Sequence, residues 1–245
     1  MKRTLFGVIA SILPKSTEEL RKALAKSNGA TSLEIRMDLL PRSDLDDGFI
    51  GVVASEKRPV ILAMDPHAPA NGWTAAALQE RWEFWQRLPR ELRRLIDNRT
   101  SEVYVDWGHE LAVFTTQKHL DQLFPWEKIG IDFHDFDKTP DEKRLGSQLF
   151  AMQLSRAQAF IKIVTKALKE ADLQVIERLL SGKKDPRPHF VFAMGEAGKR
   201  SRMECLTWGS AATYGYVPGF GPTAPGQLSI VELLENSSVI MGLRR

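Results

Sequence analysis

The chain of 245 residues is poor in cysteine, in long apolar runs and in net charge. Its one cysteine, Cys205, has no partner for an intramolecular disulfide, so nothing indicates an oxidising compartment, and we expect a cytoplasmic protein. No run is long and apolar enough to span a bilayer, which argues against a membrane protein. The chain has 34 basic and 31 acidic residues, and the resulting net charge of +3 is too small to indicate nucleic-acid binding.

The N-terminus contains a short resemblance to a signal peptide. Met1–Arg3 is basic and Leu5–Ala10 is apolar, but Pro14 and Lys15 follow without a small-x-small cleavage site. Ser16-Thr17-Glu18-Glu19 has the pattern of a capping box that opens a helix. We therefore expect a first buried strand followed by a helix.

Apolar runs typical of strands alternate with helical patterns along the whole chain. The strands are predicted at Leu5–Ser11, Ser32–Leu39, Pro59–Met64, Glu102–Trp107, Lys128–Phe133, Ala159–Val164, His189–Met194 and Ala211–Val217. Helical spacing is clearest at Thr17–Lys26, Trp73–Asp97 (with a break or kink at Pro89), Asp141–Arg156, Asp172–Leu180 and Arg200–Leu206. Eight strand–helix units in one domain, residues 1–245, predict an α/β protein with a (β/α)8 TIM barrel, with a doubly wound open sheet as the alternative.

Lys162 lies in the middle of the apolar strand Ala159–Val164. Burial disfavours an ammonium group, so such a lysine is expected to have a lowered pKa. A neutral lysine amine can attack a carbonyl group and form a Schiff base. The alternative is a lysine near the end of the strand whose long side chain reaches solvent. This segment alone does not decide between the two interpretations.

Three charged residues alternate with apolar ones on the second strand. Glu34, Arg36 and Asp38 are spaced by two, which places them on one side of the strand, and in a barrel that side faces inward. Buried charges must pair or bind a ligand. We expect Glu34 and Arg36 to contact a ligand and Asp38 to belong to a structural ion-pair network.

His134 and Asp135 end the fifth strand, immediately before the strand of Lys162. Functional residues of a (β/α)8 barrel lie at the carboxyl ends of its strands, where a histidine can act as a general acid or base. A lone histidine is more often structural, but neighbouring parallel strands lie only about 4.8 Å apart. His134 and Lys162 are therefore predicted to address one small molecule together.

Two later segments can bind an anionic ligand. Gly195, Gly198, Ser201 and Arg202 follow the seventh strand, where backbone N–H groups and an arginine at a helix start suit a carboxylate or phosphate. The loop 218–227 is either a surface connection or a lid that brings Thr223 and Gln227 over the ligand. Asp106 and His109 do not have convincing metal-ligand spacing, so no metal is predicted.

Taken in order, these segments resemble the type I 3-dehydroquinate dehydratase family. The matching pieces are Glu34-x-Arg36-x-Asp38, His134-Asp135-Phe136-x-x-Thr139-Pro140, Lys162-Ile163, Met194-Gly195 with Ser201-Arg202, Gly209-Ser210-Ala211-Ala212-Thr213 and Ala224-Pro225-Gly226-Gln227. They extend from the second strand to the last loop. The histidine motif and Ala-Pro-Gly-Gln are specific, and the others gain weight from their order.

The resemblance implies a barrel, often dimeric, that works without a metal or an organic cofactor. It implies that Lys162 forms an imine with the C3 ketone of 3-dehydroquinate and that His134 moves the protons. It assigns the substrate carboxylate to Arg202, helped by Thr223 and Gln227 of the lid, and the ring hydroxyls to Glu34 and Arg36.

The chain departs from the family pattern after the third and fourth strands. Asp65 occupies the position of a substrate-site arginine, and the glutamate that usually pairs with the histidine is missing, which is expected to leave His134 without an orienting carboxylate. Asp106-Trp107-Gly108 replaces Asp-Leu-Glu. These changes leave two alternatives to an active dehydratase: a Schiff-base enzyme for another carbonyl compound, and a non-catalytic ligand-binding barrel.

Overall fold

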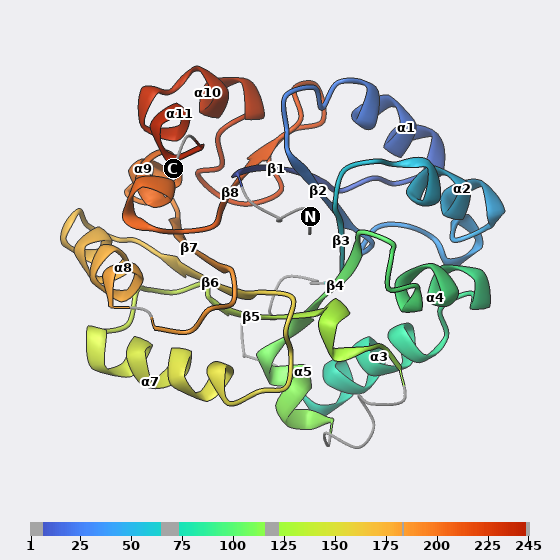
Figure 1. Ribbon diagram of the computed structural model, residues 1–245, viewed down its shortest axis with the longest axis horizontal. Helices are drawn as coiled ribbons and strands as arrows, with labels where there is room; N and C mark the ends of the chain where they lie inside the picture. Colours follow the sequence, from blue (N-terminus) through green and yellow to red (C-terminus); the bar gives the residue numbers. More distant parts are fainter. Residues whose placement is uncertain (1–6, 65–73, 116–122, 183, 244–245) are drawn as a thin grey trace.

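The computed structural model describes residues 7–64, 74–115, 123–182 and 184–243, and within them eight parallel strands form a single sheet (Figure 1). The strands are β1 (Gly7–Ile12), β2 (Ser32–Arg36), β3 (Val60–Ala63), β4 (Val103–Gly108), β5 (Ile129–Asp135), β6 (Ile161–Lys166), β7 (His189–Met194) and β8 (Ala212–Tyr216). From β1 to β7 each strand pairs with the next one in sequence, and β8 pairs with β1. All eight predicted strands are confirmed, with bounds shifted by a few residues.

The sheet curls until β7 and β8 meet. The Ala211 N–H donates to the His189 carbonyl at 2.7 Å, and the Ser210 hydroxyl accepts the Val191 N–H at 3.1 Å. The helices surround this nearly closed barrel on the outside (Figure 1). The (β/α)8 prediction is confirmed, and the open doubly wound sheet is wrong.

The described helices are α1 (Thr17–Ala25), α2 (Asp47–Ser55), α3 (Ala75–Gln86), α4 (Arg90–Asp97), α5 (His109–Phe114), α7 (Glu142–Gln153), α8 (Ala171–Ser181), α9 (Lys199–Trp208), α10 (Ile230–Glu235) and α11 (Ser237–Leu243). Ser16 caps α1 by accepting the Glu19 N–H, while the Glu19 carboxylate accepts the N–H of Lys15. No helix within the described residues is long and apolar enough to cross a membrane.

The predicted helix Trp73–Asp97 divides at Pro89. The helix α3 ends at Gln86 and α4 begins at Arg90, because the proline ring fixes its own backbone and cannot donate a helical hydrogen bond. On α3, Trp82 and Trp85 are buried against Trp107 of β4, with ring centroids 6.0 and 5.7 Å apart. The tryptophans of this helix therefore belong to the core between helix and barrel.

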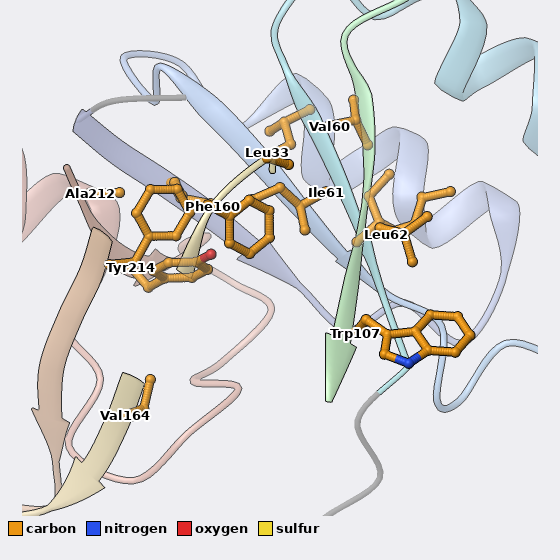
Figure 2. Packing of buried hydrophobic residues seen from close by; sticks show 14 of the residues in the cluster. Leu33, Val60, Ile61, Leu62, Trp107, Phe160, Val164, Ala212 and Tyr214 are labelled. Carbon is orange, nitrogen blue, oxygen red and sulfur yellow. The ribbon is translucent and has the colours of Figure 1, made fainter. Parts of the chain in front are cut away.

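The amino-terminal part of the barrel interior is filled by aromatic rings. The rings of Phe160 and Phe190 stack with centroids 4.8 Å apart, and Tyr214 lies 6.2 Å from Phe190. Phe160 and Tyr214 are labelled among the buried residues in Figure 2. Gly130 of β5 makes room for this packing, since a Cβ atom there would lie 2.2 Å from the Phe160 ring. The inward-facing polar residues lie above this aromatic floor, towards the carboxyl ends of the strands.

Candidate active site

One cavity at the carboxyl ends of the strands collects seven of the residues that the sequence predicts for the site. Its empty space of about 490 Å³ includes open solvent at the mouth of the cavity. Its lining includes the seven predicted residues Glu34, Arg36, His134, Lys162, Arg202, Thr223 and Gln227, together with Ser11, Phe136, Val164, Phe192, Met194, Tyr214, Ala224 and Pro225. The roles of these residues towards a ligand remain predictions, whereas their convergence is observed.

Lys162 projects from β6 into the barrel and is 6 % exposed. Its Nζ atom lies 2.7 Å from Oδ2 of Asp106 and 3.1 Å from Oε1 of Glu34, and it sits 5.1 Å from the centroid of the Tyr214 ring. The three charged residues come from β6, β4 and β2, so the closed barrel brings together positions far apart in the chain. The interpretation of Lys162 as a side chain that reaches solvent is wrong.

The two carboxylates reverse the expected protonation of the lysine. Burial lowers the pKa of Lys162, but the charges of Asp106 and Glu34 outweigh it and hold the pKa well above its ordinary value. The expectation of a lowered lysine pKa is therefore wrong for the ligand-free site. Burial, helped by the nearby charge of Asp132, raises the pKa of Asp106 to about 7. The ion pair thus contains a carboxylate that can accept a proton near neutral pH.

His134 has a carboxylate partner that the comparison with the family pattern did not predict. Its Nδ1 atom lies 2.6 Å from Oδ2 of Asp132, two residues earlier on β5, and its ring stacks on Phe136 with centroids 5.5 Å apart. Burial opposes ionisation of Asp132, but the charge and hydrogen bond of His134 hold the pKa of this carboxyl well below its ordinary range. The expectation that His134 lacks an orienting carboxylate is therefore wrong.

The loop 218–227 closes over the cavity. The hydroxyls of Thr223 and Ser11 lie 2.8 Å apart, and the Ser11 hydroxyl donates to Oε2 of Glu34 at 2.5 Å. The Gln227 side-chain oxygen accepts the Thr223 N–H at 2.7 Å and its hydroxyl at 3.0 Å. The hydroxyl groups of Thr223 and Ser11 therefore connect the loop to Glu34, which is paired with Lys162 inside the barrel.

The loop also rests on the turn after β7. The Gly195 N–H donates to the Pro225 carbonyl at 3.0 Å. Gly226 has a φ of +70°, and a Cβ atom there would lie 2.3 Å from the Gly195 carbonyl oxygen. Only glycine allows both the left-handed backbone and this close approach.

Arg202 is a cation enclosed by protein. It projects from α9, is 1 % exposed, and its guanidinium lies 4.7 Å from the centroid of the Phe192 ring. Its Nη1 atom makes a long contact of 3.4 Å with the Tyr214 carbonyl, and Nε has no hydrogen-bond partner among the described residues. Burial lowers its pKa to about 10. Buried donors without partners favour an anionic ligand.

The remaining polar residues near the site have structural contacts. The Ser201 hydroxyl donates to the Gly198 carbonyl and accepts the Ala193 N–H, so it holds α9 against β7. Arg36 forms an ion pair with Asp38, as predicted for a structural role of Asp38, while Arg36 also lines the cavity. No cluster of three potential metal ligands occurs in the described parts of the chain. Asp65 lies outside the described residues.

Four residues of the site were not predicted as such: Ser11, Asp106, Asp132 and Tyr214. Asp132 had a usable signal, because residues two apart on a strand share a face, which puts it beside His134. The sequence marks Asp106 only as a possible metal ligand and as the start of a family motif that departs at Gly108, with no sign that it faces Lys162. Ser11 and Tyr214 gave no signal, since their positions depend on the pairing of β1 with β8.

Comparison with known proteins assigns the chain to a family. The sequence model of the family described as type I 3-dehydroquinase matches residues 8–243. The chain belongs to this family. A 3-dehydroquinate dehydratase from Methanocella arvoryzae is 34% identical over 240 residues, which cover 97% of each chain. One from Methanosarcina acetivorans is 27% identical over 235 residues, covering 93% of this chain and 91% of the relative.

Solved structures share the fold. The type I 3-dehydroquinate dehydratase of Clostridium difficile, solved with covalently modified comenic acid, superposes with a TM-score of 0.70 at 21% identity and covers 99% of this chain and 94% of its own. The enzyme from Geobacillus kaustophilus gives a TM-score of 0.71 at 18% identity, covering 98% and 93%. The chain is thus a member of a hydro-lyase family and has the same (β/α)8 barrel fold as the solved structures of that family.

Proposed function

We propose that the cavity dehydrates 3-dehydroquinate to 3-dehydroshikimate through an imine on Lys162. The observation that carries this proposal is the meeting of Lys162, His134 and Arg202 in one cavity of a chain that belongs to the type I family. These residues supply an amine for a ketone, an imidazole for proton transfer and a cation for a carboxylate. The substrate contains all three matching groups.

Imine formation begins with the lysine proton. The ammonium of Lys162 is 2.7 Å from Asp106, whose raised pKa lets it accept the proton as the ketone enters. The neutral amine then adds to C3 and forms a carbinolamine. His134 assists the departure of the C3 oxygen as water, which leaves an iminium ion beside the Glu34 carboxylate. Glu34, which remains ionised, can then stabilise this cation in place of the ammonium.

The iminium ion makes the adjacent C2 proton acidic, because the nitrogen accepts the electron pair left behind. His134 removes this proton and returns it to the C1 hydroxyl, which departs as water when the C1–O bond breaks. Addition of a second water to the iminium carbon then breaks the C–N bond and releases 3-dehydroshikimate. The net change is the loss of one water, without a change in oxidation state or a cofactor.

Substrate orientation follows from the charges that line the cavity. Arg202 is assigned to the substrate carboxylate, because its buried guanidinium has an unsatisfied donor. Thr223 and Gln227 close over that end from the loop, while Glu34 and Arg36 contact the ring hydroxyls. The proposal extends to a homodimer in the shikimate pathway, as the resemblance implies, and to the cytoplasm, as expected from the single cysteine.

The test combines turnover with covalent trapping. The protein is mixed with 3-dehydroquinate, and the conjugated enone is followed by its absorbance. Borohydride is then added, and the mass of the intact protein is measured. We expect turnover and one reduced adduct in the wild type, and neither in Lys162→Met. Lys166→Met, on the same strand, is the matched control and should retain both. An adduct formed only with other ketones would indicate a different carbonyl substrate.

A further inference from the structure

The side of the cavity around His134 is where this chain departs from the family pattern. We infer that Asp132 and Arg81 replace the missing support: Asp132 orients His134, and Arg81, admitted by Gly108, lies beside Asp132 as its cation. This inference deepens the proposed dehydratase function and rests on it for the reaction. The arrangement of the three side chains can be tested without substrate.

Asp132 is placed to fix the histidine tautomer. It is 4 % exposed, and its Oδ2 atom accepts the His134 Nδ1–H at 2.6 Å. Both side chains project from the same face of β5, a rigid strand whose neighbours on each side are hydrogen-bonded to it. With Nδ1 held as the donor, proton exchange with a ligand falls to Nε2. A carboxylate at this distance also stabilises the imidazolium that forms when Nε2 takes a proton.

Arg81 is a buried cation that extends towards the Asp132 side of the cavity from a helix outside the barrel. It projects from α3 and is 2 % exposed. Its Nε and Nη2 atoms donate to the Met64 carbonyl, just after the carboxyl end of β3, at 3.1 and 2.8 Å. These two hydrogen bonds fix the plane of the guanidinium, and Nη1 reaches on towards Gly108 of β4.

Gly108 provides the space that Arg81 occupies. A Cβ atom at this position would lie 2.9 Å from Nη1 and 3.0 Å from Nη2 of Arg81. The backbone does not require glycine, because Gly108 has a φ of −57°. In the sheet register Gly108 is paired with Asp132, so the guanidinium fills the place of a side chain next to that carboxylate. A residue with a side chain here, such as the glutamate of the family pattern, would displace it.

The charges around Asp132 favour its ionised form. His134 acts most strongly, and Lys162 and Arg81 add to its effect, so the pKa of Asp132 stays well below its ordinary value despite burial. The acidic neighbours oppose this: Asp106 and Glu110 have raised pKa values, partly because of Asp132 itself. His109 also faces this group, and burial lowers its pKa. A cation fixed by two hydrogen bonds therefore matters in a crowded acidic site.

The first test is spectroscopic and uses no substrate. A hydrogen-bonded Nδ1–H proton of His134 should appear downfield in the proton NMR spectrum of the full chain, and its loss in His134→Gln assigns it. We expect it to disappear in Asp132→Asn and to persist in Asp135→Asn. Asp135, three residues further along the chain from Asp132, accepts the N–H groups of Asp137 and Lys138, so the control removes a nearby charge without touching the ring. Persistence in Asp132→Asn overturns the inference.

The second test separates positioning from binding. In Asp132→Asn we expect kcat for 3-dehydroquinate to fall about 10²-fold with KM changed less than about threefold, since the residue acts on proton transfer through His134. The acid limb of the kcat–pH profile should move to lower pH, because the imidazolium loses its anion. Asp135→Asn should match the wild type. Equal kcat in the two variants, or a change in KM alone, contradicts a positioning role.

Gly108→Ala tests the role of Arg81 while Asp132 and His134 stay unchanged. The variant remains informative if Asp132→Asn does not fold. The added methyl must push the guanidinium away, and we expect kcat to fall about tenfold. Gly51→Ala, where a Cβ atom meets nothing within 4 Å, is the control. A kcat unchanged by Gly108→Ala overturns the assignment of Arg81. Absence of turnover in the wild type would refute the proposed function, while the NMR signal would still decide the pairing.

Discussion

Two buried cations share the cavity, and their surroundings differ. Lys162 lies between Asp106 and Glu34, at 2.7 and 3.1 Å, so its charge is compensated within the protein. Arg202 is more deeply buried but rests on the Phe192 ring and a long contact to the Tyr214 carbonyl, and none of the ion pairs among the described residues includes it. The environment of Lys162 suits a positive charge that is lost and formed again during a reaction. The environment of Arg202 suits a cation that awaits an anionic ligand.

This difference separates chemistry from recognition. On the proposed function, Asp106 takes the proton of Lys162, and the Glu34 carboxylate then stabilises an iminium ion of the same charge at the same place. On the proposed function, the free-energy cost of burying Arg202 is offset when the substrate carboxylate binds beside it. The same substitution at the two positions should therefore have opposite effects on stability, which makes the comparison testable.

The largest effect is expected for Lys162→Met. Removal of the nucleophile should lower kcat by at least about 10⁴-fold. It also leaves two buried carboxylates without their cation, so the free energy of unfolding should fall by about 3–5 kcal/mol. Enone absorbance and urea denaturation measure the two quantities. Retained turnover or unchanged stability would show that the ion pair has neither role.

The pH dependence of the stability of Asp106→Asn, compared with the wild type, should show at which pH the Asp106 carboxyl of the ion pair loses its proton. Because the folded chain raises the pKa of Asp106 to about 7, the folded state holds this proton more tightly than the unfolded state. The resulting stability is present below about pH 4 and is lost as the pH rises through about 7. The advantage in stability of wild type over Asp106→Asn should therefore decrease by up to about 4 kcal/mol between these values. Denaturation curves across this range would refute the raised pKa if the difference stayed constant.

Arg202→Met should have opposite effects on binding and stability. Loss of the cation is expected to raise KM about 10²-fold, because a charge-assisted contact to the carboxylate is removed. The free energy of unfolding should increase by about 1–2 kcal/mol, since an apolar side chain suits this buried position better. Steady-state kinetics and urea denaturation provide the check, and a destabilised variant with unchanged KM would reverse the assignment.

The smallest effect is expected at the loop. Thr223→Val keeps the shape but removes the hydroxyl that contacts Ser11 and Gln227, and should lower kcat/KM by about three- to tenfold. Thr223→Ser keeps the hydroxyl and should stay close to the wild type. If both variants lose activity equally, the methyl group rather than the hydroxyl matters.

The fold was predictable because each strand has a local signature. Runs such as Ala159–Val164 and His189–Met194 are apolar enough to indicate buried parallel strands without knowledge of their neighbours. Pro89 marked the division between α3 and α4. Four of the described helices were not predicted: α5, α10 and α11 have only six or seven residues, which carry too little periodicity, and the nine residues of α2 include the poor helix formers Gly48 and Gly51.

The site was predictable in part of its members but not in its charges. Lys162 is visible as a lysine in the middle of an apolar strand, and His134 as a polar residue at a strand end. The raised pKa of Lys162 is set by Asp106 and Glu34, which are 56 and 128 residues away in sequence and meet it only in the closed barrel. Arg81 reaches the site from a helix on the outside, so no strand pattern could reveal it.

One measurement tests the roles of Lys162 and Arg202 together. It is the fraction of protein trapped by borohydride as a function of 3-dehydroquinate concentration, with the adduct located by peptide mapping. Wild type and Arg202→Met should reach the same endpoint with the adduct on Lys162, while Arg202→Met needs about 10²-fold more substrate for half-saturation. An adduct on another lysine, or two superposable curves, would contradict the division between Lys162 as the reacting group and Arg202 as the carboxylate site.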